Sequence, residues 1–185
     1  MTENEKRVTG LEVLFKTLIP VLTLVVIFAC QHYGALNTDN FVTSQKNGIF
    51  SIFTGPLFHG SFNHIIGNII PMLVCIPILV KYFNKYYAKV MIFGYLIPAI
   101  VIYYLNIPSI GISGLGYALA FFIMSAGIFS ENRTKFAFGI AAIFFYGGLI
   151  KGATILAGSG ISWKAHLAGL IAGLTLGIFT IKIKK

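Results

Sequence analysis

Hydrophobic residues fall into six long runs along this chain of 185 residues, and short polar turns separate one run from the next. The runs cover, in order, residues 14–33, 61–80, 88–105, 113–129, 136–152 and 164–181. Each run is close to the ~20 residues that a helix needs to cross the hydrocarbon core of a bilayer. The pattern therefore predicts six membrane-spanning helices.

The composition supports the same interpretation. The mean hydropathy is +0.85 and only 10% of the residues are charged, whereas an ordinary soluble domain has about 25% charged residues. No polar stretch is long enough for a separate soluble domain, so we expect one all-α membrane domain over residues 1–185, with short tails at 1–12 and 182–185. Cys30 and Cys75 both lie in apolar runs, which is typical of small buried side chains and not of a disulfide or metal pair.

The net charge of +9 is explained by where the basic residues lie along the chain. Six spans place both termini on one side of the membrane. If that side is the cytoplasm, eleven of the fourteen Lys and Arg residues are cytoplasmic: Lys6, Arg7, Lys16, Lys81, Lys85, Lys89, Arg133, Lys135, Lys182, Lys184 and Lys185. An excess of Lys and Arg is typical of cytoplasmic loops. We therefore expect a multi-pass protein of a cell membrane with both termini cytoplasmic, and the basic charge requires no nucleic-acid partner.

Two connections between the runs stand out by length and composition. Residues 34–60 form the longest polar connection, and the apolar patch at 49–53 within it is expected to lie in the membrane interface. Residues 153–163 are rich in Gly and Ser and are expected to form a flexible loop before the last helix.

Polar side chains gather at the beginning of the second, fourth and sixth runs. They are His59, His64 and Asn68, then Ser113 and Tyr117, and then His166. Because these three helices cross the membrane in the same direction, the side chains share one level near the outer surface. A helix from Ser113 to Phe129 is only ~25 Å long against ~30 Å of hydrocarbon, which places the serine below that surface. Irregular backbone at such a depth is tolerated only inside protein or beside a wet cavity, so we expect a water-filled pocket open to the outside.

Small residues follow the polar positions at helical spacing. His166 is followed on its helix face by Gly169 and Gly173, and Ser113 is followed by Gly116 at the same spacing. Small residues let membrane helices approach closely. If the two faces pack together, His166 lies against Ser113, which is the arrangement that a serine nucleophile and its general base require.

The residues at this level suit acyl transfer by a serine–histidine pair. No Asp or Glu occurs in any of the six runs, which argues against a Ser-His-Asp triad. His166 would take the proton of Ser113 and return it to the leaving amine, while Tyr117 braces the imidazole. His64 and Asn68 would donate hydrogen bonds to the developing oxyanion together with the backbone N–H of Ser113, and such donors contribute ~3–4 kcal/mol each.

Simpler interpretations exist for each residue by itself. A serine in a membrane helix usually packs or bonds to its own helix, and His64 with Asn68 could form an interhelical pair. A metal site made by His59, His64 and His166 is less favoured, because the first two are five residues apart and no Cys or carboxylate accompanies them. We expect neither a metal nor a cofactor.

Taken together, the three motifs resemble those of the rhomboid intramembrane serine proteases. The motifs are His59-x4-His64-x3-Asn68, Gly111-Ile112-Ser113-Gly114 followed by Tyr117, and Ala165-His166-x2-Gly169-x3-Gly173. The resemblance implies a six-transmembrane-helix bundle, a catalytic dyad of Ser113 and His166, and an oxyanion site at His64 and Asn68. Supporting roles fall to the other matching positions, namely Tyr117, His59, Gly111, Gly114 and Gly169.

The resemblance also implies how such a protein works in the membrane. The fifth helix and residues 153–163 would gate the site, with the loop as a mobile cap, and transmembrane proteins would be cleaved near small, helix-destabilising residues. The connection at 34–60 lacks the Trp-Arg pair that is common in the family.

The sequence thus predicts a serine endopeptidase that hydrolyses peptide bonds of transmembrane substrates near the outer face of the membrane. A catalytically silent rhomboid-like chaperone is less favoured because it would lack Ser113 or His166, and both are present. A small transporter with a polar vestibule is less favoured still, because the inner halves of the runs carry no matching polar residues.

Overall fold

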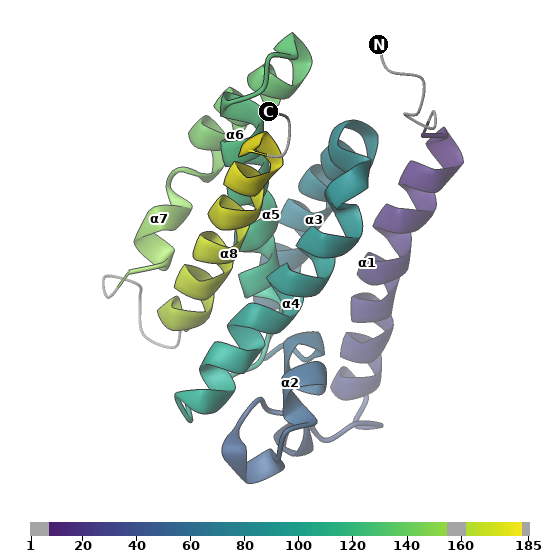
Figure 1. The fold of residues 1–185 in the computed structure, drawn as a ribbon. Helices are drawn as coiled ribbons and strands as arrows, with labels where there is room; N and C mark the ends of the chain where they lie inside the picture. Colours follow the sequence, from purple (N-terminus) through teal and green to yellow (C-terminus); the bar gives the residue numbers. More distant parts are fainter. Residues whose placement is uncertain (1–7, 155–161, 183–185) are drawn as a thin grey trace.

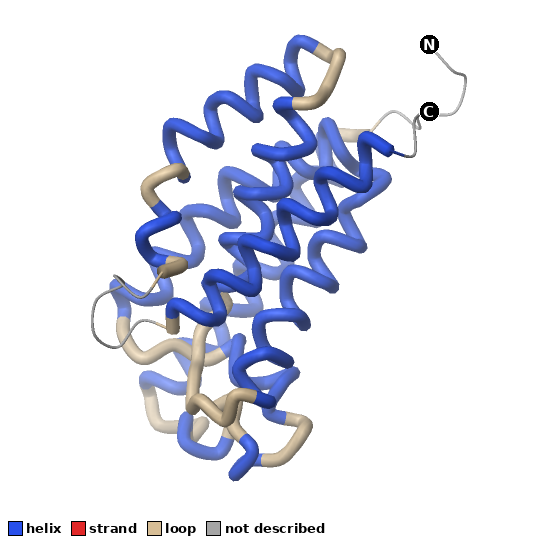
Figure 2. Tube along the Cα trace, turned by 60° about the vertical axis from the view of Figure 1, so that its left-hand side comes forward, coloured by secondary structure: helices blue, strands red, loops and turns tan. Residues whose placement is uncertain are grey.

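The computed structural model describes residues 8–154 and 162–182, and within this part of the chain it contains helices and loops but no strand (Figure 2). Six helices of 14 to 23 residues pack into a bundle (Figure 1). They are α1 (Gly10–His32), α3 (Phe62–Phe83), α4 (Tyr87–Tyr104), α5 (Ser113–Ile128), α6 (Arg133–Tyr146) and α8 (Trp163–Lys182). Two short helices, α2 (Ser51–Thr54) and α7 (Leu149–Gly152), lie in the connections.

The helix α5 forms the centre of the bundle. Thirteen of its sixteen residues are buried, and it packs against α3, α4, α6 and α8, most closely against α8. Leu119, Ala120 and Phe122 have no exposed surface at all. By contrast, α1 packs against α3 at the edge of the bundle. The central helix therefore carries Ser113 at its first residue and holds it in a fixed place.

Glycines on α8 permit its close approach to α5. A Cβ atom on Gly169 would overlap the carbonyl oxygen of Gly114, and one on Gly173 would overlap the carbonyl oxygen of Ala118. The expected pairing of small-residue faces is thus present, but the face of α5 is different from the one expected. Gly116 points instead toward α3, where a Cβ would lie 3.7 Å from Pro71. The reason is that Gly169 and Gly173, four residues apart on α8, meet Gly114 and Ala118, four residues apart on α5. Gly116 does not belong to that row.

Five of the six hydrophobic runs each correspond to one long helix, whose limits differ from those of the run by at most four residues. The first helix begins at Gly10, four residues before the start of its run, because the Thr9 hydroxyl accepts the backbone N–H of Glu12 and caps the first turn. The fifth run was expected to form one helix, and this expectation is wrong. The chain leaves α6 after Tyr146 and turns at Gly147 and Gly148, and α7 is a separate helix. Consecutive glycines favour such a break because they cost a helix about 1 kcal/mol each relative to Ala.

Several of the helices are apolar enough for a membrane. Within the described residues, three stretches have the length and hydropathy to cross a bilayer: Gly10–His32, Phe62–Tyr104 and Trp163–Thr180. The second stretch contains both α3 and α4, which run in opposite directions (Figure 1). Ser113–Ile128 is apolar but shorter. These helices indicate a multi-pass membrane protein, while α5 and α6 are each shorter than the ~20 residues of a typical span.

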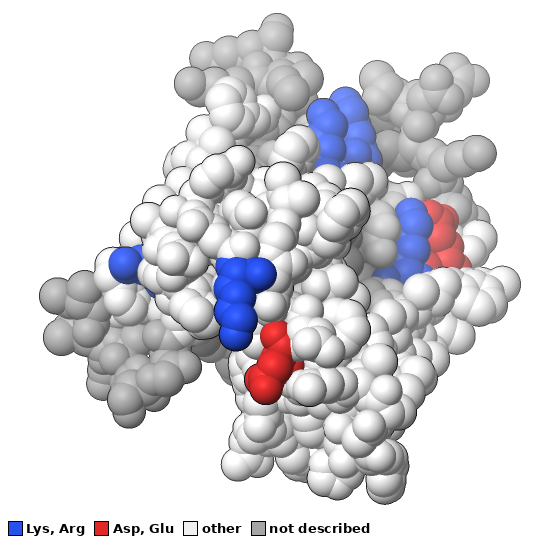
Figure 3. Space-filling view, turned by 90° about the horizontal axis from the view of Figure 1, so that it is seen from below, with Lys and Arg blue, Asp and Glu red and all other residues white. Residues whose placement is uncertain are grey.

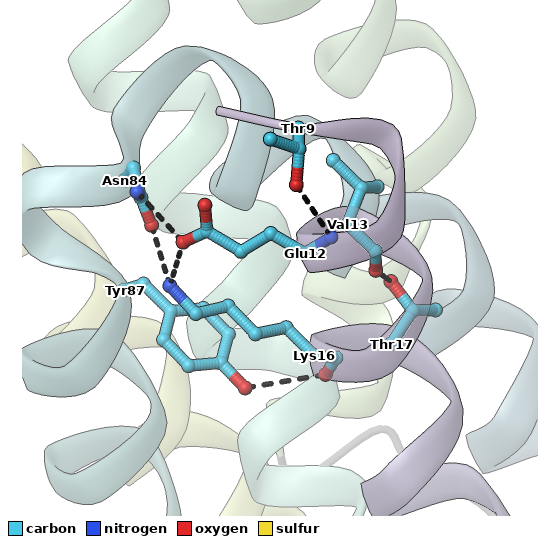
Figure 4. A network of polar contacts seen from close by, with 7 residues as sticks. All are labelled: Thr9, Glu12, Val13, Lys16, Thr17, Asn84 and Tyr87. Carbon is cyan, nitrogen blue, oxygen red and sulfur yellow. Dashed lines mark hydrogen bonds and ion pairs between the residues drawn. The ribbon is translucent and has the colours of Figure 1, made fainter. Parts of the chain in front are cut away.

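A polar cluster joins α1 to the turn between α3 and α4 (Figure 4). The Lys16 ammonium donates to a Glu12 carboxylate oxygen at 2.7 Å and to the Asn84 side-chain oxygen at 2.9 Å. The Asn84 amide donates to the same Glu12 oxygen, and the Tyr87 hydroxyl donates to the Lys16 carbonyl. The cluster ties the edge helix to the bundle at the end where α1 begins and α8 ends (Figure 1).

Candidate active site

Ser113 is the first residue of α5, and the backbone before it is held in an unusual conformation. Gly111 has a φ angle of +104°, a region that residues with a side chain rarely adopt. A Cβ at this position would also lie 2.6 Å from the ring of His64. Glycine is required here for both reasons. At the next glycine of the motif, Gly114, a Cβ would lie 2.5 Å from Pro98 of α4, so the two glycines fix the serine tightly among its neighbours.

The connection at 34–60 supports the chain ahead of this serine. Thr43 and Ser109 exchange two backbone hydrogen bonds, and the N–H of Gly111 donates to the carbonyl of Gly55. Gly55 lies so close to Thr43 that a Cβ would overlap the Thr43 hydroxyl. Within this connection Phe50 and Phe53 are exposed, and the placement of this apolar patch in the membrane interface stays a prediction. The loop is therefore a scaffold for the segment that leads into α5.

Ser113 and His166 lie in direct contact. The Nε2 atom of His166 is 2.7 Å from the Ser113 hydroxyl oxygen, and its Nδ1 atom is 2.8 Å from the carbonyl oxygen of Gly152. A carbonyl can only accept a hydrogen bond, so Nδ1 must carry the proton of a neutral ring. The lone pair of Nε2 therefore faces the hydroxyl. This is the tautomer in which an imidazole can act as a base toward a serine.

The Gly152 carbonyl was not anticipated from the sequence. The usual partner of such an imidazole is a carboxylate, and sequence patterns reveal carboxylates by residue type. A backbone acceptor leaves no such signal, because every residue has a carbonyl. The one indirect clue is that position 152 is a glycine: a Cβ there would overlap the Tyr117 hydroxyl. Tyr117 in turn stacks on His166, with 4.3 Å between the ring centroids.

His64 and Asn68 lie one turn apart on α3 and face the same cavity as the Ser113–His166 pair. Asn68 is buried, and its side-chain nitrogen has no hydrogen-bond partner among the described residues. A buried amide without a partner costs about 1–3 kcal/mol. Such a group at a cavity wall is available to donate to a ligand oxygen. The helix α3, which carries both residues, is capped by Ser61, whose hydroxyl accepts the backbone N–H of His64.

His59 lies behind His64 and is completely buried. Its ring meets that of His64 edge-on at 5.0 Å, and its Nδ1 atom is 3.3 Å from the carbonyl oxygen of Leu57. The side chain of Gln31 in α1 bonds to both the N–H and the carbonyl of His59. Burial, and secondarily the neighbouring His64, lowers the pKa of His59 to about 4, so the ring is neutral at physiological pH. His59 therefore supports the wall of the site and does not contact Ser113 or His166.

The cavity has a volume of about 1060 Å³, which is far larger than the ~30 Å³ that one water molecule occupies in the liquid. Its lining combines the site residues with segments of three loops: Val42, Gly60, Ser61, Asn63, His64, Gly67, Asn68, Ile107, Pro108, Ser109, Ile110, Ser113, Tyr117, Ser162 and His166. It lies at the end of the bundle where α3, α5 and α8 begin (Figure 1). A polypeptide segment and water can both be accommodated beside Ser113.

The three histidines considered as a metal site do not form one. Within residues 8–154 and 162–182, no group of three or more His, Cys, Asp or Glu side chains could hold a metal ion. The expected mobile cap at 153–163 falls largely on residues 155–161, which lie outside the described residues.

Residues 46–183 match the Rhomboid domain family, and this region includes His59, His64, Asn68, Ser113, Tyr117, Gly152 and His166. The chain belongs to the rhomboid family. The resemblance seen in the sequence motifs is thereby confirmed. The rhomboid family includes intramembrane serine proteases.

Relatives of this rhomboid occur in mycobacteria. Uncharacterized proteins of Mycobacterium tuberculosis and Mycobacterium bovis are each 27% identical over 171 residues, covering 85% of this chain and 70% of the relative. An uncharacterized protein of Mycobacterium leprae is 28% identical over 187 residues, covering 94% of this chain and 73% of the relative. The similarity thus extends over most of this rhomboid.

Proposed function

We propose that this rhomboid is an intramembrane serine protease that cleaves transmembrane proteins with Ser113 as nucleophile and His166 as general base. The observation that carries the proposal is the 2.7 Å contact between the Ser113 hydroxyl and Nε2 of His166, in a ring whose Nδ1 proton is held by a carbonyl. Membership of the rhomboid family supports the same chemistry. No metal or cofactor takes part in it.

The reaction begins when the Ser113 oxygen attacks the scissile carbonyl carbon while its proton passes to Nε2 of His166. The carbonyl oxygen becomes an oxyanion, which the side chains of His64 and Asn68 and the N–H of Ser113 stabilise. As the C–N bond breaks, His166 gives its proton to the leaving amine, and an acyl-enzyme ester remains. Water then attacks the ester with His166 again as base, and the serine hydroxyl is restored.

The unpartnered Asn68 amide supports the assignment of the oxyanion site. A donor that is already desolvated and has no ground-state partner gains its full hydrogen bond only when negative charge develops near it. Such donors contribute ~3–4 kcal/mol each to the transition state. His64 lies one turn before Asn68 on α3 and faces the same cavity, so the two can act on one oxygen.

We further propose that all six long helices cross a cell membrane, with both termini in the cytoplasm and the site opening to the outside. The distribution of basic residues supports this orientation, because the turns at Lys81–Lys89 and Arg133–Lys135 lie at the end of the bundle where α1 begins. The opposite end, seen in Figure 3, shows few charged side chains among the described residues. Residues 1–185 then act as a single domain whose substrates enter from the bilayer.

The decisive test uses a Ser113→Ala variant. The purified wild-type protein, reconstituted in vesicles with a transmembrane substrate, is expected to release cleaved product and to react covalently with a fluorophosphonate at Ser113. Both activities should vanish in Ser113→Ala and in His166→Ala. Ser130→Ala, beyond the other end of α5, is the matched control and should behave as wild type. Undiminished cleavage by Ser113→Ala would refute the proposal, and a wild type inert in both assays would favour a silent chaperone instead.

A further inference from the structure

The group that orients the His166 ring is placed on a different element from the rest of the site. Ser113 and Tyr117 belong to α5, and His166 belongs to α8, but the acceptor of the Nδ1 proton is the carbonyl of Gly152 at the end of α7. We propose that this carbonyl takes the place of the triad carboxylate, so that the dyad is competent only while α7 is seated against Tyr117 and His166. This inference rests on the proposed function and specifies how that function is controlled.

The chemical argument concerns the tautomer of a neutral imidazole. With the carbonyl in place, the proton is held on Nδ1, and Nε2 can accept the Ser113 proton. When the carbonyl is removed, nothing keeps the proton on Nδ1. A ring protonated at Nε2 can only donate to the serine hydroxyl and cannot act as its base. In Ser-His-Asp enzymes, holding the ring in the wrong tautomer lowers kcat about 10⁴-fold.

The steric argument concerns the absence of a side chain at position 152. A Cβ on Gly152 would overlap the Tyr117 hydroxyl and would lie 3.7 Å from Nδ1 of His166. Tyr117 cannot easily yield, because it is buried and its ring stacks on His166 and lies parallel to that of Phe121, 6.3 Å away. Glycine is therefore the residue that lets the carbonyl reach the imidazole while the stack remains intact. The next residue, Ala153, is buried at 2% exposure, which fixes the seat of this segment.

The mechanical argument concerns how α7 is attached. It is separated from α6 by the turn at Gly147 and Gly148. The end of α6 and the start of α7 expose large apolar side chains, with Phe144 at 83%, Phe145 at 82% and Ile150 at 52% exposure. Between Tyr146, which packs against the core, and the buried Ala153, the described side chains of this segment bury little surface. Elements with few buried contacts open at low free-energy cost.

The base of α6 is held more firmly than its tip. Near the other end of the bundle, a Cβ on Gly139 of α6 would lie 2.8 Å from backbone atoms of Gly127 in α5, so the two backbones are in close contact. The Asn132 side chain caps the first turn of α6 by accepting the N–H groups of Thr134 and Lys135. Because α6 is packed closely at its first half, the turn at Gly147 and Gly148 and the helix α7 can move away from the bundle while the start of α6 stays in place. A substrate that displaces the tip removes the acceptor of His166, and catalysis resumes only after α7 returns to its seat.

This linkage is reciprocal. Seating of α7 favours the Nδ1-protonated ring, so a ligand that binds only to that form of the ring must in turn favour the seated position of α7. The two effects have the same free energy. Ser113 therefore becomes nucleophilic only after the substrate has passed α7 and α7 has returned to its contact with Tyr117 and His166.

The test reads the tautomer of His166 directly by nitrogen NMR of imidazole-labelled protein in micelles, with the resonance assigned by a His166→Ala sample. The wild type is expected to carry its ring proton on Nδ1. Gly152→Ala should move a substantial share of that proton to Nε2. In the double variant Gly152→Ala with Tyr117→Phe, the hydroxyl that the new methyl group meets is gone, so the Nδ1 proton should return. Gly10→Ala, at the far end of the bundle, is the matched control, because a Cβ there has open space around it.

The rate of fluorophosphonate labelling at Ser113 is the second readout. Gly152→Ala should lower it by about 10-fold or more, and the double variant should recover most of the loss relative to Tyr117→Phe alone. With a peptide substrate, the loss in Gly152→Ala should appear in kcat and leave KM nearly unchanged. An effect on kcat without any change of tautomer would mean a merely structural role and would overturn the inference.

The outcomes separate this inference from the proposed function. A wild-type ring protonated on Nε2, or a Gly152→Ala ring that keeps its proton on Nδ1, overturns the inference even if the protein cleaves substrates. If the wild type cleaves nothing but its tautomer responds to Gly152→Ala, the inference about the orienting group holds and the proteolytic function fails. Should Gly152→Ala not fold, the wild-type tautomer and the double variant still decide the matter.

Discussion

The ring of Tyr117 lies nearly parallel to the ring of His166, with 4.3 Å between their centroids and 12° between their planes. Because Tyr117 belongs to the buried central helix, its ring gives the imidazole a rigid surface to rest on. His166 is thus held on one face by stacking, at Nδ1 by the Gly152 carbonyl and at Nε2 by the Ser113 hydroxyl. Three constraints in different directions leave the ring little freedom to tilt away from the serine.

The stacking should matter more than the phenolic hydroxyl. Tyr117→Phe keeps an aromatic face against the imidazole, whereas Tyr117→Leu removes it. An aromatic pair contributes about 0.5–1.5 kcal/mol beyond burial, so Tyr117→Leu should lower the rate of Ser113 labelling by up to about 10-fold. Tyr117→Phe should retain most of the wild-type rate. Equal rates for the Leu variant and the wild type would show that stacking does not orient the base.

Asn68 should show opposite effects on activity and stability. Asn68→Leu replaces a buried amide, whose nitrogen has no partner in the part of the chain that the structure describes, with an apolar group of similar size. We expect kcat to fall by about 10²–10³-fold with little change in KM, because an oxyanion donor acts mainly in the transition state. The variant should unfold at the same temperature as the wild type or higher, because an unsatisfied polar group is removed. A marked loss of thermal stability would instead indicate a structural role for the amide.

His59 should make the stability of the fold sensitive to acid. Burial lowers the pKa of His59 from its ordinary 6.5 to about 4, so the unfolded chain binds a proton at a higher pH than the folded protein does. The contribution is fully present above pH 6.5 and is lost as the pH falls from 6.5 to about 4. It amounts to about 3 kcal/mol. Thermal unfolding of the wild type across this interval should show the decline.

A His59→Gln variant provides the control for the pH effect. Gln has no titrating proton in this range, so the slope of stability against pH should be clearly smaller than that of the wild type. A slope as steep as that of the wild type would assign the acid sensitivity to another group.

Gly169 should be intolerant of even a single methyl group. A Cβ there would overlap the Gly114 carbonyl oxygen, and Gly169 lies one turn after His166 on α8. Gly169→Ala should therefore push α8 away from α5 and destabilise the protein by about 1–3 kcal/mol, as overpacked sites do. The serine labelling rate should fall as well. Gly10→Ala, where a Cβ meets nothing, is the matched control, and similar behaviour of the two variants would contradict the close packing.

The sequence revealed the helices and most of the site because both depend on residue type. Long apolar runs mark the helices, and polar residues such as Ser113, His166 and Asn68 are conspicuous within them. The structure brings Ser113, Tyr117 and His166 into contact as expected, whereas their catalytic roles stay a prediction. What could not be predicted depends on the backbone: the break of the fifth run at Gly147, the carbonyl partner at Gly152, and the choice of Gly114 over Gly116 as the surface that meets α8.

The hydrogen bond between His166 and the Gly152 carbonyl has one last consequence. A carboxylate in that position would lose its charge in acid and could be deleted by one substitution. A peptide oxygen has no proton to gain at any ordinary pH, and every amino acid would supply it. The support of this imidazole is thus insensitive to acidity, and it is withdrawn only when the main chain moves, as it would if a side chain at position 152 met Tyr117.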